Sequence, residues 1–169
     1  MNQSTHAALT SHASDEWRTP AYIIDAAIRV MGTIDCDPAS PYSDGPVPAT
    51  IRYTKEDDGL SHPWNGTVFL NPPFGQVKQF VVKALTEFKS GRMTEGILIT
   101  SGGFDTAWWS LLKSYTWCGH RGRIKFIPAD GNQKNSSTRP NALFYLGNNG
   151  KLFFEVFSQF GPIYKEVPL

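Results

Sequence analysis

The segment Thr67-Val68-Phe69-Leu70-Asn71-Pro72-Pro73-Phe74-Gly75 decides the fold class. Its first four residues are apolar or β-branched, which is typical of a strand buried on both faces of a sheet. The run stops at Asn71, and apolar residues then recur at helical spacing over 77–88. A buried strand that ends in a tight loop and leads into a helix is the building unit of an α/β protein.

The same alternation extends in both directions from this segment. A helix is predicted over 20–31, with Thr19 as its N-cap and Gly32 at its end, and a second short helix over 107–112. Strands are predicted over 33–36, 96–100, 124–127 and 142–146, and over 151–157 as the second strand of a hairpin. The pattern predicts one α/β domain, with a mixed, mostly parallel sheet and an antiparallel edge.

Length and composition set the broad class. The chain has 169 residues, which predicts a single domain over 15–169, preceded by a flexible arm over 1–14. The arm lacks the apolar core of a secretory signal, and no run approaches the roughly 18 apolar residues of a membrane span. We therefore expect a cytoplasmic protein without a membrane partner, in which Cys36 and Cys118 are buried free thiols. No second ligand pair accompanies Cys118 and His120 at a suitable spacing, so no metal site is predicted.

Asn71-Pro72-Pro73-Phe74 is the sharpest chemical feature. Ligands of open α/β sheets bind just past the carboxyl ends of the strands, where this loop lies. Two prolines stiffen the backbone, so that the Asn71 amide and a proline carbonyl can accept the two hydrogens of a planar exocyclic amine such as adenine N6. Phe74 can stack on a base that has left its helix. The alternative is a rigid turn with Phe74 in the core.

Two acidic segments are candidates for cofactor contacts. Asp35 and Asp37 close a predicted first strand, where a carboxylate can bind an amino group or a ribose; a helix cap or Asx turn is the alternative. Asp57-Asp58-Gly59-Leu60 precedes the strand that leads to Asn71, and Asp58 can accept a hydrogen bond from an adenine amine. A solvated turn is the alternative there.

Taken together, these segments resemble the phage-type DNA N6-adenine methyltransferase family, often called Dam, over about residues 15–147. The segments that carry the resemblance are Trp17-Arg18-Thr19-Pro20, 35–39, 53–60 with Trp64, 71–75, 105–109 and 122–126. Two departures stand out. No glycine-rich loop follows the first strand, and Ser101-Gly102-Gly103 follows the strand over 96–100.

The resemblance implies a Rossmann-like methyltransferase fold that binds S-adenosylmethionine and methylates a flipped adenine at a specific site in double-stranded DNA. It implies a catalytic loop of Asn71, Pro72, Pro73 and Phe74. It implies cofactor contacts from Trp17, Thr19, Pro20, Asp35, Asp37, Pro38 and Asp58, with the Trp17–Pro20 segment against the methionine end of the cofactor. It also implies a bacterial or phage-infected cell, where the modification would protect DNA from restriction.

DNA contacts must come from local charge, because the formal net charge is only +1. We predict that the basic groups of the second half contact phosphates: Arg121, Arg123, Lys125, Lys134 and Arg139. Arg139 or Asn135 is a candidate base reader, and ordinary surface charge is the alternative for each of these residues. The sequence leaves the oligomeric state and the recognition sequence open.

Two other functions stay open at this point. The same fold and loop could serve another planar amine: cytosine N4, an RNA adenine or a protein amide. The missing glycine-rich loop is also compatible with a non-catalytic nucleic-acid-binding relic.

Overall fold

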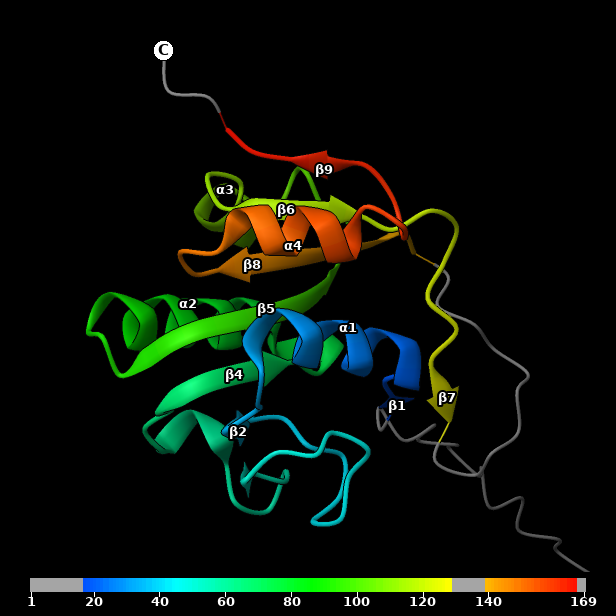
Figure 1. Cartoon of the computed structure of the whole chain (residues 1–169). Helices are drawn as coiled ribbons and strands as arrows, with labels where there is room; N and C mark the ends of the chain where they lie inside the picture. Colours follow the sequence, from blue (N-terminus) through cyan, green and yellow to red (C-terminus); the bar gives the residue numbers. More distant parts are fainter. Residues whose placement is uncertain (1–16, 129–138, 167–169) are drawn as a thin grey trace, which may run out of the picture.

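The computed structural model describes residues 17–128 and 139–166, which form one central seven-stranded sheet with helices on both faces (Figure 1). The strand order is β3-β2-β4-β5-β8-β6-β9. Strands β3, β2, β4 and β5 are parallel, and β8, β6 and β9 continue the sheet through antiparallel pairs. We call the edge where β2, β4 and β5 end the carboxyl edge and the opposite edge the amino edge. The strands are β2 (Cys36–Asp37), β3 (Ile51–Arg52), β4 (Gly66–Leu70), β5 (Met93–Ser101), β6 (Thr116–Gly119), β8 (Asn141–Leu146) and β9 (Ile163–Tyr164).

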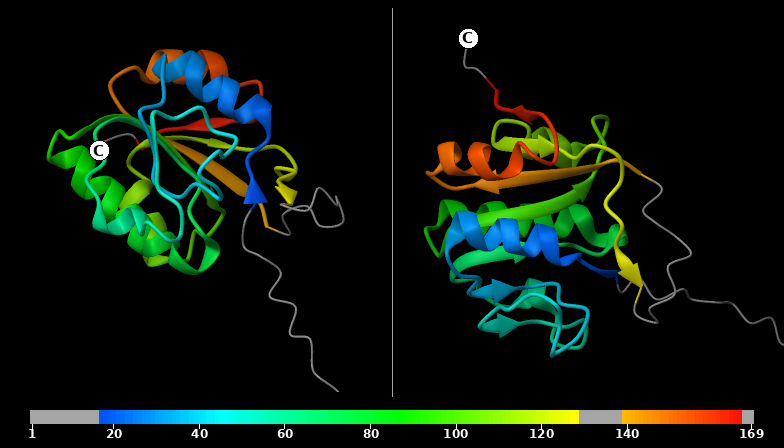
Figure 2. Two further views of the ribbon diagram at one scale, coloured as in Figure 1. Left: turned by 90° about the horizontal axis from the view of Figure 1, so that it is seen from below. Right: turned by 45° about the vertical axis from the view of Figure 1, so that its right-hand side comes forward.

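Helices cover both faces of the sheet. Figure 2 shows α1 (Ala21–Met31) and α4 (Gly150–Phe157) on one face, and α2 (Val77–Lys89) and α3 (Ala107–Leu112) on the other. Two short 3₁₀ turns, η1 (Gly59–Ser61) and η2 (Phe74–Gln76), lie in the loops around β4. This layering explains why β4, β5 and β8 are apolar on both faces: each is buried between two helix layers.

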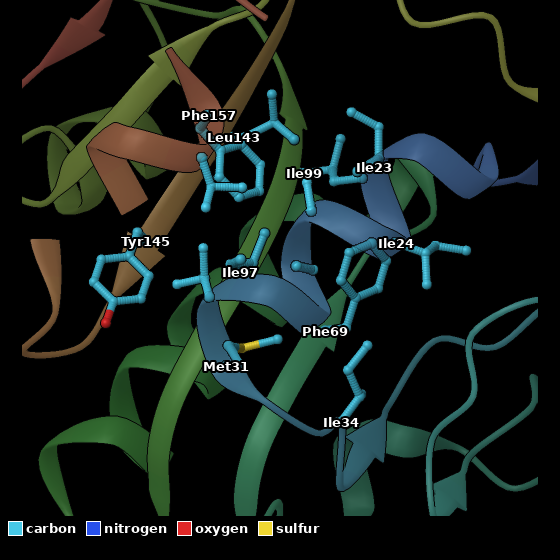
Figure 3. Packing of buried hydrophobic residues seen from close by; sticks show 14 of the residues in the cluster. Ile23, Ile24, Met31, Ile34, Phe69, Ile97, Ile99, Leu143, Tyr145 and Phe157 are labelled. Atoms are coloured by element: carbon cyan, nitrogen blue, oxygen red, sulfur yellow. The ribbon is translucent and has the colours of Figure 1, made fainter. Parts of the chain in front are cut away.

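The first core cluster lies between the sheet and the α1–α4 layer. Ile23 and Ile24 of α1 point toward Phe69 of β4 and Ile99 of β5 (Figure 3). Each of these four side chains is at most 5% exposed. Burying such side chains stabilises the fold by roughly 1.5–3 kcal/mol each. This packing holds the first turn of α1 beside the carboxyl end of β4.

The second core cluster lies beneath α2 and α3. Val81 and Ala84 of α2 pack against Val68 and Leu70 of β4, and Trp64 closes the layer with its ring stacked near Phe80. Trp64 is fully buried and donates from Nε1 to the Gly59 carbonyl oxygen at 2.8 Å. The two clusters thus pack against opposite faces of β4, the strand that leads into Asn71.

A separate two-stranded ribbon joins distant parts of the sequence. Strand β1 (Trp17–Arg18) pairs antiparallel with β7 (Ile127–Pro128), with Trp17 opposite residue 128 and Arg18 opposite Ile127. The ribbon lies beside the first turn of α1 (Figure 1).

The predicted α/β class and the mixed, mostly parallel sheet are confirmed, and several of the predicted elements are corrected. Residues 150–157 form helix α4 rather than a hairpin strand, because their apolar side chains recur at helical spacing and Asn149 accepts a cap hydrogen bond from the Leu152 amide at 3.3 Å. The antiparallel strand β8 lies inside the sheet, between β5 and β6. Four strands were not predicted: β1, β3, β6 and β9. Of the strands predicted over 33–36 and 124–127, only Cys36 and Ile127 lie in one.

Candidate active site

A pocket of about 740 Å³ opens at the carboxyl edge of the sheet, next to the ends of β2 and β4. This is within the range of roughly 300–1,000 Å³ that is usual for small-molecule sites. Three parts of the chain line it: the loops after β2 and β3, the loop after β4, and the ribbon region. The lining residues are Trp17, Pro38, Ala39, Ser40, Pro41, Thr54, Lys55, Asp58, Gly59, Asn71, Pro72, Pro73, Phe74, Gly75, Gln76, Phe80 and Phe126.

All four residues of the predicted catalytic loop line this pocket. Asn71 follows the last residue of β4, and Pro73 turns the chain into the 3₁₀ turn, where the Gln76 amide donates to the Pro73 carbonyl oxygen at 2.9 Å. Pro72 is buried, whereas Phe74 is 51% exposed. Phe74 therefore does not fill the core, and the alternative of a purely structural turn loses its main support.

Thr19 lies behind Asn71 rather than in the pocket lining. Asn71 donates from Nδ2 to the Thr19 hydroxyl oxygen at 3.2 Å, and Thr19 is 4% exposed. The predicted N-cap role of Thr19 is wrong, because α1 begins after Pro20, whose extended backbone takes the cap position without a side-chain hydrogen bond. Neither Thr19 nor Pro20 lines the pocket within the described residues.

Trp17 and Phe126 form the wall contributed by the ribbon region. Trp17 is half-buried and packs against the first core cluster, and Phe126 belongs to that cluster. Arg18, which follows Trp17 in β1, places its guanidinium carbon 5.0 Å from the centroid of the Tyr42 ring. The ribbon therefore also contacts the loop after β2. The pocket thus depends on residues from both halves of the chain.

The loop after β2 forms the opposite wall without a glycine-rich sequence. Pro38, Ala39, Ser40 and Pro41 line the pocket, and the Ser40 amide donates to the Tyr53 carbonyl oxygen at 2.9 Å. Gly59 packs tightly against this loop, because a Cβ atom there would lie 2.0 Å from the Pro38 carbonyl oxygen. The proline-rich loop and the Gly59 turn therefore make one continuous wall.

Asp37 supports this wall from beneath. Its carboxylate is 3% exposed and accepts from the Ala39 amide at 3.3 Å, and it is not part of the lining. Burial raises the pKa of Asp37 to about 7, although hydrogen bonds from Ala39 and Ser40 and the charge of Arg52 act in the opposite direction. Asp37 is thus placed to shape the loop rather than to touch a ligand.

The structure separates the roles of the adjacent Asp57 and Asp58. Asp57 closes a turn, since its Oδ2 accepts from the Thr54 amide at 2.9 Å and from the Thr54 hydroxyl at 2.8 Å. These hydrogen bonds hold the pKa of Asp57 below its ordinary value. Asp58 lines the pocket, and it is the one non-glycine residue with positive φ, 53°, in the described chain. Such conformations carry a cost and often occur at ligand sites.

The predicted cofactor contact from Asp35 is not supported. Asp35 lies at the amino edge, where its Oδ2 accepts from the Thr67 amide at 2.8 Å and from the Thr67 hydroxyl at 3.1 Å. Gly66 has φ 77°, and a Cβ atom there would lie 2.1 Å from this same oxygen. Asp35 therefore joins the start of β2 to the start of β4 at the amino edge, whereas the pocket lies at the carboxyl edge.

The predicted DNA-binding residues lie outside the pocket lining as far as the structure describes them. Arg121, Arg123 and Lys125 are exposed on the segment between β6 and β7, and Arg139 is exposed just before β8. Because β6 runs in the same direction as β5, this segment leaves the sheet at the carboxyl edge. Lys134 and Asn135 lie outside the described residues.

Ten lining residues are not among the predicted site residues: Ala39, Ser40, Pro41, Thr54, Lys55, Gly59, Gly75, Gln76, Phe80 and Phe126. The helical spacing predicted that Phe80 is buried, and its place at the start of α2 explains why it also reaches the pocket. Three others lie in turns or irregular segments: Lys55, Gln76 and Phe126. In such segments the periodicity of the sequence does not predict which way a side chain points.

Other classes of site find no support in residues 17–128 and 139–166. Within these residues, no group of three or more His, Cys, Asp or Glu side chains is arranged to hold a metal ion. Cys36 and Cys118 are buried free thiols, as predicted. None of the helices described here has both the length and the apolar character that crossing a bilayer would need.

Two comparisons with known proteins complete the description of the site. No curated protein matches the chain. The family model for DNA N-6-adenine-methyltransferase (Dam) matches residues 6–158, a range that includes every residue of the pocket lining. The chain therefore belongs to the DNA N-6-adenine-methyltransferase (Dam) family.

Proposed function

We propose that this protein transfers a methyl group from S-adenosylmethionine to N6 of an adenine flipped out of double-stranded DNA, at a specific short sequence. The observation that carries the proposal is the shared pocket: the Asn71–Phe74 loop and the wall containing Asp58 line the same cavity. The family implies adenine in DNA rather than cytosine, RNA or a protein amide. A lined cavity of this size also argues against a non-catalytic relic.

The Asn71 loop offers what a poor amine nucleophile needs. The lone pair of adenine N6 is delocalised into the ring, so attack requires acceptors that hold its two hydrogens and draw the nitrogen toward tetrahedral geometry. Asn71 Oδ1 is available for this role, because Nδ2 is engaged by Thr19. The Pro72 carbonyl is the second proposed acceptor, and half-exposed Phe74 is proposed to stack on the base. Rigid acceptors placed in advance lower the barrier without reorganisation.

The residues of the opposite wall fit S-adenosylmethionine. Asp58 supplies a carboxylate for an adenine amine or ribose hydroxyl, and Pro38, Phe80 and Trp17 supply apolar surface. The cofactor, when bound, supplies a methyl group on a sulfonium that already carries its leaving group, so a strong general base at Asn71 is not required. Thr19, Pro20 and Asp37 then support this site from behind its lining.

Backbone contacts must offset the few kcal/mol that extruding a base from the helix costs. Arg121, Arg123 and Lys125 extend from the carboxyl edge, where the pocket opens, and we propose that they contact phosphates of the flanking duplex together with Arg139 and Lys134. We further propose that the enzyme acts in the cytoplasm of a bacterial or phage-infected cell and protects DNA from restriction.

Asn71→Ala tests the proposal. The wild type, incubated with duplex DNA and isotope-labelled S-adenosylmethionine, should yield labelled N6-methyladenine in a digest analysed by mass spectrometry. Asn71→Ala should lower kcat about a hundred- to a thousandfold, the size seen when one transition-state hydrogen bond is removed. Calorimetry should show an unchanged Kd for S-adenosylmethionine. Label in N4-methylcytosine, in RNA or in protein would replace the proposed substrate, and a fully active variant would exclude the proposed role of Asn71.

A further inference from the structure

We infer that Thr19 is a positioning residue, which fixes the orientation of the Asn71 amide so that Oδ1 faces the substrate amine. The inference rests on the proposed function and deepens it. It also assigns Thr19 a role different from the cofactor contact that the sequence resemblance implies. The observation behind this inference is a contact between two groups. The buried Thr19 hydroxyl, just before α1, lies against the Asn71 amide, just after the end of β4.

The contact joins residues that are 52 positions apart in the sequence. Thr19 is 4% exposed, so water does not compete freely for its hydroxyl. Within the described residues, Asn71 Nδ2 is the only side-chain hydrogen-bond partner of this hydroxyl. Asn71 itself is only partly buried and faces the pocket. The buried Thr19 hydroxyl therefore restricts the partly buried Asn71 amide, which faces the pocket.

An asparagine amide has two ends of nearly equal shape and opposite hydrogen-bonding character. One orientation presents Oδ1 to the pocket and can accept an N6 hydrogen. The orientation rotated by 180° presents Nδ2, which places donor against donor and cannot activate the amine. Stacking and shape do not distinguish the two, so a hydrogen-bond partner behind the amide has to do so.

The geometry favours Nδ2 toward Thr19. The 3.2 Å separation lies within the usual range of roughly 2.7–3.2 Å for N–H···O, and it exceeds the roughly 2.5–3.0 Å of O–H···O. A Thr19 hydroxyl donating to Oδ1 would therefore be expected to lie closer. With Nδ2 held at the back, Oδ1 is left for the pocket.

Thr19 is itself held in place from both sides. Strand β1 ends one residue before it and is paired with β7, and Pro20 follows with its fixed φ of −66° and leads into α1. Helix α1 is anchored by fully buried Ile23, which belongs to the same core as Phe69 of β4. The Thr19 hydroxyl oxygen therefore has little freedom to move closer to a rotated Asn71 amide.

Thr19→Val and Thr19→Ser form the primary test, with kcat for N6-methyladenine formation and Kd for S-adenosylmethionine as readouts. Valine keeps the shape and removes the acceptor, so kcat should fall about tenfold, the effect of losing a hydrogen bond worth roughly 1.4 kcal/mol. Serine keeps the hydroxyl and should restore kcat to within about twofold to threefold of wild type. The Kd for S-adenosylmethionine should stay the same in both variants.

Thr100→Val is the matched control for removing a buried threonine hydroxyl. Thr100 is 3% exposed, and its hydroxyl has no hydrogen-bond partner within the part of the chain that the structure describes. This variant should keep the wild-type kcat. Thermal unfolding of all three variants, compared with wild type, separates a loss of fold from a loss of orientation.

A double-mutant cycle gives the sharpest readout. In an Asn71→Asp background both terminal side-chain atoms are oxygens, so an oxygen faces the pocket in either orientation. Thr19→Val should then change kcat by less than about twofold to threefold. If Asn71→Asp alone is inactive, the comparison of Thr19→Val with Thr19→Ser decides.

The outcomes separate this inference from the proposed function. A wild type that forms no N6-methyladenine contradicts the proposed function. An active wild type with a fully active Thr19→Val, or with a Kd for S-adenosylmethionine that weakens as kcat falls, overturns the positioning role. An equal loss in the Asn71 and Asn71→Asp backgrounds would also overturn it, since that loss would not depend on amide orientation.

Discussion

At the amino edge of the sheet the Asp35 carboxylate accepts two hydrogen bonds from Thr67, whereas at the carboxyl edge the Asp58 carboxylate lines the pocket. The amino edge repeats this behaviour at β8, where Tyr145 donates to Glu95 and accepts from the Asn149 amide at 2.9 Å. These polar groups at the amino edge thus form hydrogen bonds with one another. At the carboxyl edge, Asn71 has one end engaged by the protein and the other available to the pocket.

The difference shows how one set of residue types serves two purposes. Residues at the starts of parallel strands join neighbouring strands, and their substitution should affect stability. Residues after the ends of the strands face the cavity, and their substitution should affect ligand binding or turnover. Asp37 stands between the two groups, because it lies at the carboxyl edge but is buried beneath the pocket wall.

The largest effect expected outside the catalytic loop is a pH-dependent change in stability in Asp37→Asn. The pKa of Asp37 is about 7 in the folded protein, above its ordinary value near 4, because the carboxyl is buried. Between pH 4 and 7 the unfolded chain releases this proton while the folded protein keeps it, so the stabilisation is full below pH 4 and lost as pH rises through 7. At pH 8 we expect Asp37→Asn to be more stable than wild type, on the order of a few kcal/mol.

Urea unfolding of both proteins from pH 4 to pH 8 provides the measurement. The difference between their unfolding free energies should be small at pH 4 and should grow toward pH 8. A constant difference across this range would show that Asp37 does not titrate as a buried group, and the contrast between buried and lining carboxylates would then fail.

Asp35→Ala and Asp58→Gly test the two edges directly and should give opposite results. Asp35→Ala should lower the unfolding free energy by about 1–2 kcal/mol through the lost Thr67 hydrogen bonds, with an unchanged Kd for S-adenosylmethionine. Asp58→Gly should weaken that Kd about tenfold. Glycine adopts the positive φ of this position without strain, so its unfolding free energy should change by less than about 0.5 kcal/mol. Calorimetry and urea unfolding measure both quantities, and exchanged outcomes would reverse our assignment of the edges.

The smallest expected effect concerns DNA binding. Arg121→Ala should lower the slope of log K against log salt concentration by about 0.9, the value for one phosphate contact. Arg29→Ala is the control, because Arg29 is exposed in the last turn of α1, at the opposite edge. Fluorescence anisotropy with a duplex oligonucleotide at several salt concentrations gives the slopes. Equal slopes for wild type and Arg121→Ala would remove Arg121 from the DNA interface.

Sequence patterns predicted the parts of the fold that local periodicity controls. The apolar run before Asn71, the helical spacing after it and Gly32 at the end of α1 all lie where they were expected. The segment 151–157 was misassigned because aromatic and β-branched residues favoured a strand, although Leu152, Phe153 and Val156 have helical spacing. Strand β6 depends on pairing with β8 and β9, which are distant in sequence, and its own four residues carry no clear signal.

The candidate site was only partly predictable for a related reason. Asn71 and Asp58 could be proposed because one follows and the other precedes the recognisable strand β4, and because both fit the family pattern. The sequence could not tell that Asp35 faces the amino edge, since its direction depends on the register between β2 and β4. Phe126 could not be assigned to the pocket because its position depends on the pairing of β1 with β7.

That pairing also sets when the protein can begin to work. A ribosome that has made the chain through Gly75 has produced Asn71 and its prolines, yet the wall formed by Trp17 and Phe126 cannot exist until residues 127 and 128 have been synthesised and have met β1. Ligand binding in the nascent chain should therefore start only after about three-quarters of the 169 residues have been synthesised.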